Sequence, residues 1–333
     1  MKNDENRRSL LRFIFYTSIF FYTKSLSKTF KNFTNTKVLS SPIFKKHIIS
    51  NNHPERPERI EFIRKLINNS NLSNIFENYI ENKEVEDWIK LIHSKKHILS
   101  LKSKFPLAEK VSHHAVSICL EGVDRIMNKE NKNIFCATRP PGHHALNTGK
   151  HEGFCFYNHV AITAKYIQKK YKLSRILIVD WDYHHGNSTE FFFYDDPTIL
   201  FFSTHDQFAY PGTGAPDKLG IGKGKGFNIN IHLPCSTSNK EIIDVFKNVL
   251  IPKADEFKPD FILISSGFDS RINDLLGCYK VTDQGFVELT KIVKKLANTH
   301  CKDRLLSVLE GGYNLEGNAK ATIAHVRELN NFI

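Results

Sequence analysis

Five short apolar runs in this sequence each lead directly into a cluster of polar residues. The clusters read RPPGHHA, DWDYHHGN, STHD, GFDS and EGGYN. The runs are rich in Ile, Val, Leu and Phe, a composition typical of strands that are buried on both faces of a parallel sheet. They cover residues 134–138, 176–180, 198–203, 261–265 and 305–309.

Longer amphipathic stretches alternate with these runs and with a sixth apolar run at 227–232. Helical patterns occur at 158–170, 240–257 and 283–297. A further helix is expected from His53 to Ile67, with Pro57 in its first turn, where proline is tolerated. This alternation predicts one α/β domain of three layers, in which helices flank a mostly parallel sheet. No internal repeat or linker to a second domain is present.

The carboxyl ends of parallel strands lie at one edge of a sheet, where open α/β folds build their sites. Asp182 and His184 are two residues apart after the 176–180 run, so both can face one ion, and Asp269 is the natural third ligand. Two carboxylates, one imidazole and an open position for water fit catalytic zinc. Iron(II) is an alternative for such an oxygen-rich site in a reducing cell.

Two adjacent histidines, His143 and His144, follow a Pro-Pro-Gly segment. Each ring needs an orienting partner, and Asp180 and Asn187 flank the metal loop at its two ends. An aspartate raises the pKa of its histidine by stabilising the imidazolium, whereas a neutral asparagine does so much less. The histidine that pairs with Asn187 is therefore expected to stay neutral near pH 7 and to act as a general base.

Tyr313 follows two glycines in LEGGYN, which allow the backbone to approach the site closely. A phenol there can donate a hydrogen bond to the oxyanion that forms when water attacks an amide carbonyl. Without the metal loop, simple packing would be the preferred explanation for this tyrosine.

The net charge of +12 is concentrated in the first part of the chain. Residues 1–52 hold ten Lys and Arg against two Asp and Glu, which leaves 37 against 33 in the rest. A surface that binds phosphates needs its positive charge on the folded domain, so direct nucleic-acid binding is not expected.

No acidic residue occurs between Asn6 and Pro54, where Ser, Thr, Lys, Arg and Phe are plentiful. This composition is typical of an organelle transit peptide, and equally of a disordered tail of biased composition. The apolar stretch Leu10–Tyr22 is too short for a stable membrane span, which takes roughly 20 residues, although a signal-type anchor stays open. We predict an N-terminal extension at 1–45 and a catalytic domain at 46–333. The protein is expected in the cytoplasm if bacterial, or in a mitochondrion or plastid if the extension is a targeting segment.

The six cysteines are scattered, with no Cys-x-x-Cys pair and no closely spaced framework. They indicate a reducing compartment and argue against a structural zinc knuckle. The sequence leaves the oligomeric state open.

Taken in order, the motifs HPERPER, RPPGHHA, GFCFYNHVA, DWDYHHGN, STHD with YPGTG, SSGFDS and LEGGYN resemble those of the histone deacetylase family. The similarity covers about His53 to Gly317 and is nearest the class II and bacterial or organellar branch. It implies the arginase/deacetylase fold and a zinc-dependent enzyme that removes the acetyl group from N-acetyl-lysine in proteins or peptides.

The resemblance also implies a role for each site residue. Zinc would be bound by Asp182, His184 and Asp269, with His144 as general base, His143 paired with Asp180 as electrostatic partner, and Tyr313 polarising the acetyl carbonyl. A narrow tunnel for the acyl-lysine side chain would be lined by Gly153, Phe154 and Tyr210. A potassium ion would lie near Asp180, Asp182, His184, Ser203 and Thr204.

Some positions depart from the family pattern. Ser188 stands where glycine is frequent and Leu275 where proline is usual. The stretch between His97 and His113 lacks the acidic residue that usually binds the substrate backbone.

Three other functions compete with deacetylation of acetyl-lysine. An arginase-type ureohydrolase needs two metal ions and extra carboxylates, at positions that Gly186 and Arg271 occupy here. A non-catalytic acetyl-lysine-binding protein would typically lack Tyr313 or a metal ligand. Relatives specialised for acetylpolyamines carry a carboxylate where Leu276 stands, and leucine gives a desolvated cation no partner. Acetyl-lysine is therefore favoured, with acetylpolyamine amidohydrolysis as the alternative.

Overall fold

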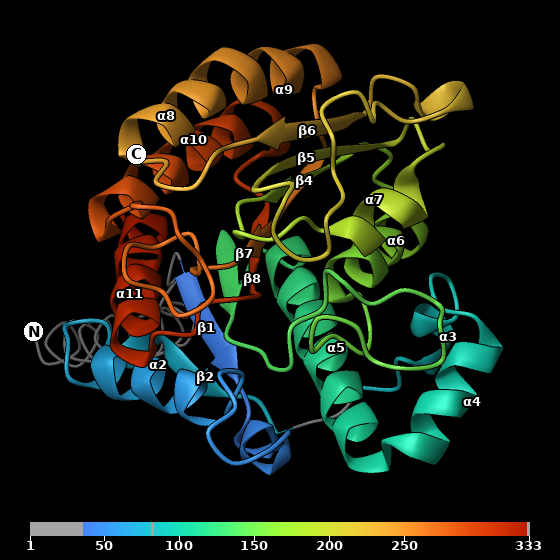
Figure 1. Ribbon diagram of the computed structural model, residues 1–333, viewed down its shortest axis with the longest axis vertical. Helices are drawn as coiled ribbons and strands as arrows, with labels where there is room; N and C mark the ends of the chain where they lie inside the picture. The colour runs from blue at the N-terminus through green and yellow to red at the C-terminus, as the bar shows by residue number, and fades with distance from the viewer. Residues whose placement is uncertain (1–35, 81–82, 332–333) are drawn as a thin grey trace, which may run out of the picture. The chain divides into compact units, whose positions relative to one another are not determined.

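One parallel sheet organises the part of the chain that the computed structural model describes, residues 36–80 and 83–331 (Figure 1). Within these residues its eight strands lie in the order β2-β1-β3-β8-β7-β4-β5-β6, and every neighbouring pair is parallel. The expected α/β fold is confirmed. The strands are β1 Thr36–Ser40, β2 Phe76–Asn78, β3 Asn133–Cys136, β4 Ile176–Asp180, β5 Ile199–His205, β6 Asn228–His232, β7 Phe261–Ser266 and β8 Leu305–Leu309.

Helices cover both faces of this sheet. They are α2 Glu58–Asn68, α3 Glu86–Ile89, α4 Lys95–Lys104, α5 Pro106–Met127, α6 His159–Tyr171, α7 Asn187–Phe193, α8 Asn239–Val245, α9 Ile251–Phe257, α10 Asp283–Cys301 and α11 Leu315–Asn330.

Strand β4 illustrates why the sheet lies between two helical layers. Its side chains alternate between the faces: Leu177 and Val179 pack in the core formed with α2, α8, α9, α10 and α11. Ile176 and Ile178 pack in the core formed with α4, α5 and α6. Because both faces are covered, the strand reads as a continuous apolar run, and its predicted bounds agree with the structure.

Polar residues that follow the strands also start helices. The side chain of Asn158 accepts a hydrogen bond from the Ala161 N–H at 2.8 Å and caps α6. Asn314 does the same for Gly317 at 2.8 Å and caps α11. Helices therefore begin at the same edge of the sheet where the polar clusters gather. Their capped first turns hold the adjoining loops in place.

The predicted 240–257 helix is divided into three segments. A π-helical stretch, Phe246–Leu250, separates α8 from α9. Pro252, in the first turn of α9, has no N–H to donate to the carbonyl four residues earlier, so regular α-helical bonding is interrupted there.

Part of the segment predicted as an N-terminal extension belongs to the sheet. Residues 36–40 form β1, which pairs with β2 on one side and β3 on the other. Val38 and Leu39 are fully buried. The rest of the predicted extension, including Leu10–Tyr22, lies outside the described residues. Among the described helices, none is both long and apolar enough to cross a membrane.

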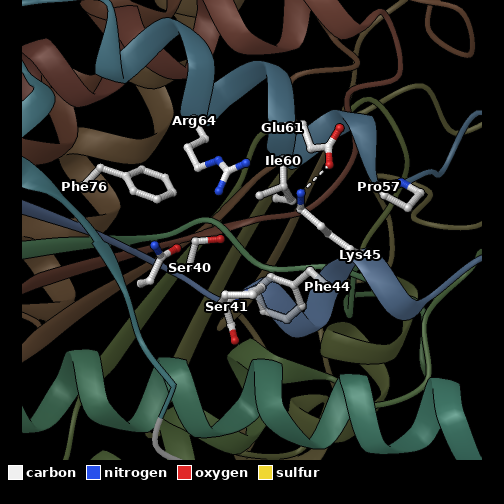
Figure 2. Close-up of a pocket in the computed structure, with 11 residues that line it drawn as sticks. Ser40, Ser41, Phe44, Lys45, Pro57, Ile60, Glu61, Arg64 and Phe76 are labelled. Carbon is white, nitrogen blue, oxygen red and sulfur yellow. Dashed lines mark ion pairs between the residues drawn. The ribbon is translucent and has the colours of Figure 1, made fainter.

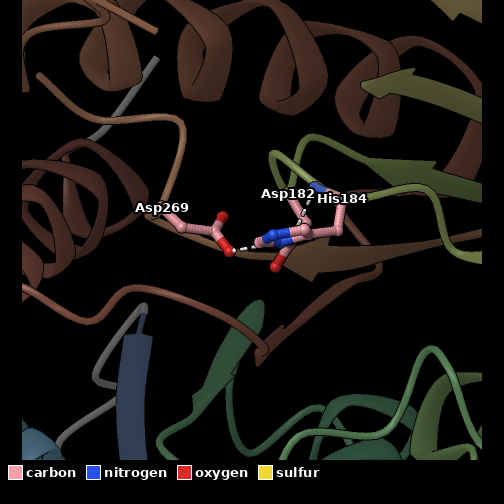
Figure 3. A group of neighbouring side chains, drawn as sticks. All are labelled: Asp182, His184 and Asp269. Carbon is pink, nitrogen blue, oxygen red and sulfur yellow. Dashed lines mark hydrogen bonds and ion pairs between the residues drawn. The ribbon is translucent and has the colours of Figure 1, made fainter. Parts of the chain in front are cut away.

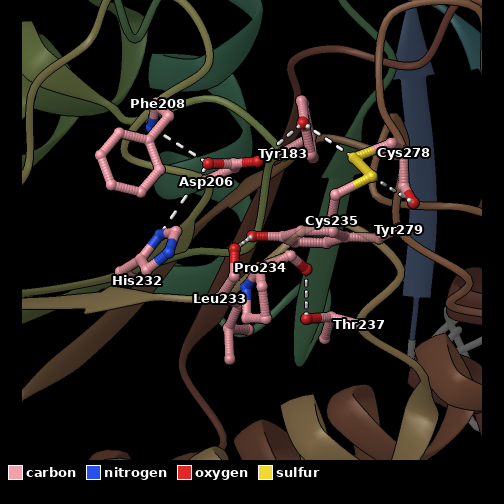
Figure 4. Close-up of a disulfide and its surroundings, with 10 residues drawn as sticks. All are labelled: Tyr183, Asp206, Phe208, His232, Leu233, Pro234, Cys235, Thr237, Cys278 and Tyr279. Carbon is pink, nitrogen blue, oxygen red and sulfur yellow. Dashed lines mark hydrogen bonds and ion pairs between the residues drawn. A yellow bond between two sulfur atoms is a disulfide. The ribbon is translucent and has the colours of Figure 1, made fainter.

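The cysteines also differ from expectation. Cys235 and Cys278 form a disulfide although 43 positions separate them, and their Cα atoms lie 5.3 Å apart (Figure 4). The other four cysteines are buried thiols. The scattered spacing of the cysteines does not indicate this pair, because it forms where two loops that are distant in sequence meet.

A small cavity lies between β1 and α2 (Figure 2). Its volume is about 20 Å³, and the Lys45–Glu61 ion pair of 2.9 Å lies in its wall. A space of this size holds about one water molecule. It is too small to be a substrate site.

Candidate active site

Asp182, His184 and Asp269 meet at the carboxyl edge of the sheet (Figure 3). The first two follow β4 and the third follows β7, the strand beside it. Their ligand atoms all lie within 4.8 Å of one another. Nδ1 of His184 is 3.0 Å from Oδ2 of Asp269 and 3.2 Å from Oδ1 of Asp182. The three residues expected to bind a metal are therefore brought together.

The surroundings of the two carboxylates fit a bound cation. Both side chains are buried, and burial together with the Asp182 charge raises the pKa of Asp269 to about 7. The Tyr183 N–H donates to Oδ1 of Asp269 at 2.9 Å, and the Gly311 N–H donates to Oδ2 of Asp182 at 2.8 Å. Two buried carboxylates and an imidazole with fixed orientation are a suitable donor set for a divalent ion.

Gly311 explains one of the glycines before Tyr313. A Cβ at this position would lie 2.0 Å from Oδ2 of Asp269 and 2.7 Å from Oδ2 of Asp182. Only glycine lets the backbone after β8 come this close to the carboxylates.

The two adjacent histidines have the partners expected for them. Nδ1 of His143 lies 3.0 Å from Oδ2 of Asp180, and Nδ1 of His144 lies 2.8 Å from Oδ1 of Asn187. Burial lowers the pKa of His143, but the charges of Asp182 and Asp180 outweigh it and raise that pKa to about 10. Burial and the neighbouring His143 hold the pKa of His144 well below its usual value. One ring is thus cationic and the other neutral near pH 7.

Two further residues, neither of them predicted from the sequence, hold the loop that carries His143 and His144. Oε2 of Glu310 accepts hydrogen bonds from the Gly142 N–H at 2.6 Å and the His143 N–H at 3.2 Å. The Ser188 hydroxyl donates to the His143 carbonyl at 2.8 Å. Ser188, a departure from the family pattern, therefore supports the loop. Glu310 belongs to the LEGGYN motif, but its contact with Gly142 and His143 depends on how β3 and β8 pair.

Tyr313 is buried and held from two sides. Its N–H donates to Oδ2 of Asp274 at 2.7 Å. The Arg59 guanidinium lies 4.9 Å from the centre of its ring and also donates to the Gly312 carbonyl at 2.7 Å. Burial raises the pKa of the Tyr313 phenol well above its usual value. The phenol is therefore protonated at neutral pH and able to donate a hydrogen bond.

These side chains open into a cavity of about 870 Å³. His144, His184 and Tyr313 lie in its wall. The four residues predicted to contact substrate also line it: Gly153, Phe154, Tyr210 and Leu276.

Gly153 keeps this cavity open beside the general-base candidate. A Cβ at Gly153 would lie 2.3 Å from Cδ2 of His144 and 2.8 Å from Cε1 of Tyr210. The His144 and Tyr210 rings lie edge to face, with their centres 4.9 Å apart.

Six more residues line the cavity that sequence reasoning missed: Phe105, Lys150, His151, Glu152, Tyr183 and Ala209. Oε2 of Glu152 is buried and has no hydrogen-bond partner among the described residues. Lys150 and Glu152 give the cavity wall one positive and one negative charge. No sequence motif marks them, because they lie in an irregular loop.

The positions proposed for a monovalent ion lie between β4 and β5. Ser203 is opposite Asp180 in the register of these strands. The Thr204 hydroxyl is buried and has no hydrogen-bond partner in the described part of the chain. Carboxylate and hydroxyl oxygens are the ligands that hard cations prefer.

Comparison with known proteins agrees with this geometry. A family model described as the histone deacetylase domain matches residues 53–329. A probable deacetylase of Archaeoglobus fulgidus is 34% identical over 291 residues, which cover 82% of this chain and 79% of that protein. The polyamine deacetylase HDAC10 of Danio rerio is 39% identical over 221 residues, which cover 65% of this chain and 32% of that protein. The crystal structure of the HDA15 HD domain has a TM-score of 0.81 and 29% identity, with coverage of 89% and 88% of the two chains.

Proposed function

This chain belongs to the histone deacetylase family of hydrolases, and on that premise we propose that it is a zinc-dependent enzyme that hydrolyses N-acetyl-lysine in proteins or peptides. The observation that carries the proposal is the convergence of Asp182, His184 and Asp269 within 4.8 Å, with His184 in the wall of a cavity that His144 and Tyr313 also line. Metal ligands, a neutral histidine and a protonated phenol are the groups that amide hydrolysis needs.

We assign the divalent ion to these three residues, with zinc as the default and iron(II) as the alternative. When bound, such an ion polarises the acyl carbonyl and makes a bound water more acidic. Within residues 36–80 and 83–331 the donors are too few for two metals. Arg271, where an arginase-type site needs a carboxylate, donates instead to Asp283 at 2.7 Å.

His144 is the proposed general base. If its Nδ1–H donates to the Asn187 amide oxygen at 2.8 Å, its Nε2 carries the lone pair that takes a proton from the attacking water. The low pKa of His144 supports this, because a base must be neutral before it acts. The cationic His143 then contributes positive charge beside the developing oxyanion without accepting a proton.

Tyr313 is the proposed oxyanion donor. Its raised pKa keeps the proton on the phenol, and the contacts with Asp274 and Arg59 fix the backbone and the ring. A donor held in place before reaction stabilises the oxyanion without a reorganisation cost. This arrangement favours a catalytic protein over a non-catalytic acetyl-lysine binder.

A structural potassium ion near Asp180, Asp182, His184, Ser203 and Thr204 is also proposed. It is supported by the unpartnered Thr204 hydroxyl and by the register that sets Ser203 beside Asp180.

The preference for acetyl-lysine rests on the aromatic and apolar part of the cavity. Phe154 and Tyr210 suit the four-methylene stem of the lysine, and Leu276 offers no charge to a second cation. Two observations favour acetylpolyamines instead: Glu152 places a carboxylate in the same cavity, and a Danio rerio relative is named a polyamine deacetylase. Acetylpolyamine amidohydrolysis is therefore kept as the second candidate.

The test is an assay of the purified chain on an acetyl-lysine peptide, N-acetylputrescine and N8-acetylspermidine, with and without a chelator. We expect kcat/KM to be higher for the peptide than for either acetylpolyamine. Activity on the peptide should be lost when the metal is removed. A higher value for either polyamine would reverse the substrate assignment, and activity that survives complete metal removal would overturn the mechanism.

Direct binding to nucleic acid is not part of the proposal, since the positive charge lies mainly in residues 1–52. Cytoplasmic location, or import into a mitochondrion or plastid through the first residues, also stays a proposal.

A further inference from the structure

The disulfide between Cys235 and Cys278 joins two loops (Figure 4). Both loops follow strands at the carboxyl edge of the sheet, where the cavity also lies. Cys235 follows β6, and Cys278 lies nine positions after Asp269, in the loop that also carries Leu276. Their Cα separation of 5.3 Å lies within the range that disulfides normally span. The pair thus connects the edge of the sheet with the loop that provides a metal ligand and part of the cavity wall.

This pair is accessible to an external thiol. Cys235 is exposed and Cys278 is partly exposed, whereas the remaining cysteines are buried. Thiol–disulfide exchange requires a thiolate to reach one sulfur atom from outside. In the described part of the chain, Cys235 is the sulfur that such a reagent meets first.

The two loops are also joined by backbone hydrogen bonds. The Ser236 N–H donates to the Cys278 carbonyl at 3.0 Å, and the Lys280 N–H donates to the Thr237 carbonyl at 2.7 Å. These bonds do not depend on the sulfur–sulfur bond. They keep the cysteines near each other after reduction, so the disulfide can form again.

Tyr183 connects the disulfide to the metal ligands. Its hydroxyl lies 3.1 Å from Sγ of Cys278, and the residue stands between Asp182 and His184 in the chain. Its N–H donates to Asp269 at 2.9 Å, and the centre of its ring is 5.0 Å from that of His184. Tyr183 and Leu276 both line the cavity. A change at Cys278 therefore acts on two parts of the cavity wall.

We propose that Cys235 and Cys278 are a reversible thiol–disulfide site that adjusts substrate affinity through Tyr183 and the Leu276 loop. The reductant is a dithiol, either a protein dithiol or a small one. Its thiolate attacks Sγ of Cys235, the sulfur–sulfur bond breaks, and Cys278 leaves as a thiolate beside the Tyr183 hydroxyl. The second thiol of the reductant then displaces Cys235, so the pair gains the two electrons and two protons that the dithiol loses.

Oxidation by a disulfide such as oxidised glutathione reverses these steps and releases two reduced glutathiones. In the oxidised form the sulfur of Cys278 is fixed beside Tyr183. In the reduced form it can rotate, and the Leu276–Cys278 segment becomes freer. Reduction should therefore raise KM more than it lowers kcat.

The first experiment counts thiols and does not depend on catalysis. The full chain is equilibrated in glutathione buffers of graded oxidation state, quenched with an alkylating reagent and analysed by peptide mass spectrometry. We expect Cys235 and Cys278 to lose reactivity together as the buffer becomes more oxidised, while Cys301 does not change. Independent titration of the two, or alkylation of both in every buffer, would overturn the proposal and would leave the proposed deacetylase function untouched.

The second experiment measures KM and kcat on an acetyl-lysine peptide in the fully oxidised and fully reduced protein, and so rests on the proposed function. We expect KM to rise about fivefold on reduction, the low end of typical coupling between two sites. Cys235→Ser and Cys278→Ser should both hold the high KM in every buffer, and Cys301→Ser should respond as wild type. Tyr183→Phe should retain the two-thiol titration but lose the KM response. Equal KM values in both wild-type forms, or a redox response in Cys235→Ser, would refute the coupling.

Discussion

Nδ1 of His144 lies 2.8 Å from the amide oxygen of Asn187, so this histidine is oriented by a neutral group, whereas the adjacent His143 is oriented by the Asp180 carboxylate. The two rings have their centres 4.0 Å apart. Their different partners help to separate their pKa values, because a carboxylate stabilises an imidazolium much more than an amide does. Neighbouring histidines can in this way have an acid–base role and an electrostatic role.

Replacing Asn187 by aspartate should weaken that separation. The new carboxylate raises the pKa of His144, so the base is protonated up to a higher pH, and activity appears only as the pH rises past the new pKa. We expect the acidic limb of the kcat/KM profile to move up by about one pH unit. A profile recorded from pH 5 to 9 tests this, and an acidic limb at the wild-type position would show that His144 is not the base.

Tyr313→Phe should retain the fold and the metal but lose about 10² to 10³ in kcat/KM, because only the hydrogen bond to the oxyanion is lost. His144→Ala should be similarly slow, since the attacking water loses its base. Metal content and melting temperature serve as controls for both variants. Activity of Tyr313→Phe within threefold of wild type would assign the oxyanion donor to another group.

The metal site should bind one divalent ion per chain. Elemental analysis is expected to give one equivalent in wild type and almost none in Asp269→Asn, with a lower melting temperature because the bound ion stabilises the folded state. Asp260→Asn is the matched control, since Asp260 lies at the opposite end of β7. Two equivalents of manganese in wild type would instead indicate a binuclear site.

Glu152→Gln separates the two substrate candidates. If the Glu152 carboxylate binds a second cationic nitrogen, the variant should lose about tenfold in kcat/KM on N8-acetylspermidine, as expected for a hydrogen bond to a charged group, and little on a neutral acetyl-lysine peptide. Glu130→Gln, on an exposed residue, is the control. Leu276→Glu should raise kcat/KM on N8-acetylspermidine relative to kcat/KM on the acetyl-lysine peptide. Equal losses on both substrates would mean that Glu152 supports the loop and does not select substrates.

Two truncations test the beginning of the domain. Removing residues 1–35 should leave kcat/KM unchanged and, if this segment is a targeting sequence, should abolish organelle import. Removing residues 1–45 deletes β1 with the buried Val38 and Leu39, whose burial contributes about 1.5–3 kcal/mol each. This longer truncation should unfold, as judged by circular dichroism and thermal melting. A stable 1–45 truncation would show that β1 is dispensable, and unchanged localisation of the 1–35 truncation would argue against targeting.

Sequence alone predicted strands β3 to β8 and placed Asp182, His184 and Asp269 at their carboxyl edge. The bounds of β4 and β8 were predicted correctly because strands buried on both faces must be apolar throughout. Asp182 and His184 lie two positions apart in the chain, so their proximity in space follows from the local sequence. Asp269 could be added because the carboxyl ends of parallel strands lie at a common edge.

Only the tertiary structure revealed the features that depend on strand order and on contacts between distant loops. β1 was missed because a five-residue strand in a polar, acid-free segment has no distinct pattern, and pairing with β2 and β3 is what buries it. Glu310 reaches the histidine loop, Glu152 reaches the cavity, and Cys235 meets Cys278 across 43 positions. Periodicity reports which face of an element is buried, whereas these contacts depend on the register and packing of elements far apart in the chain, which no local pattern encodes.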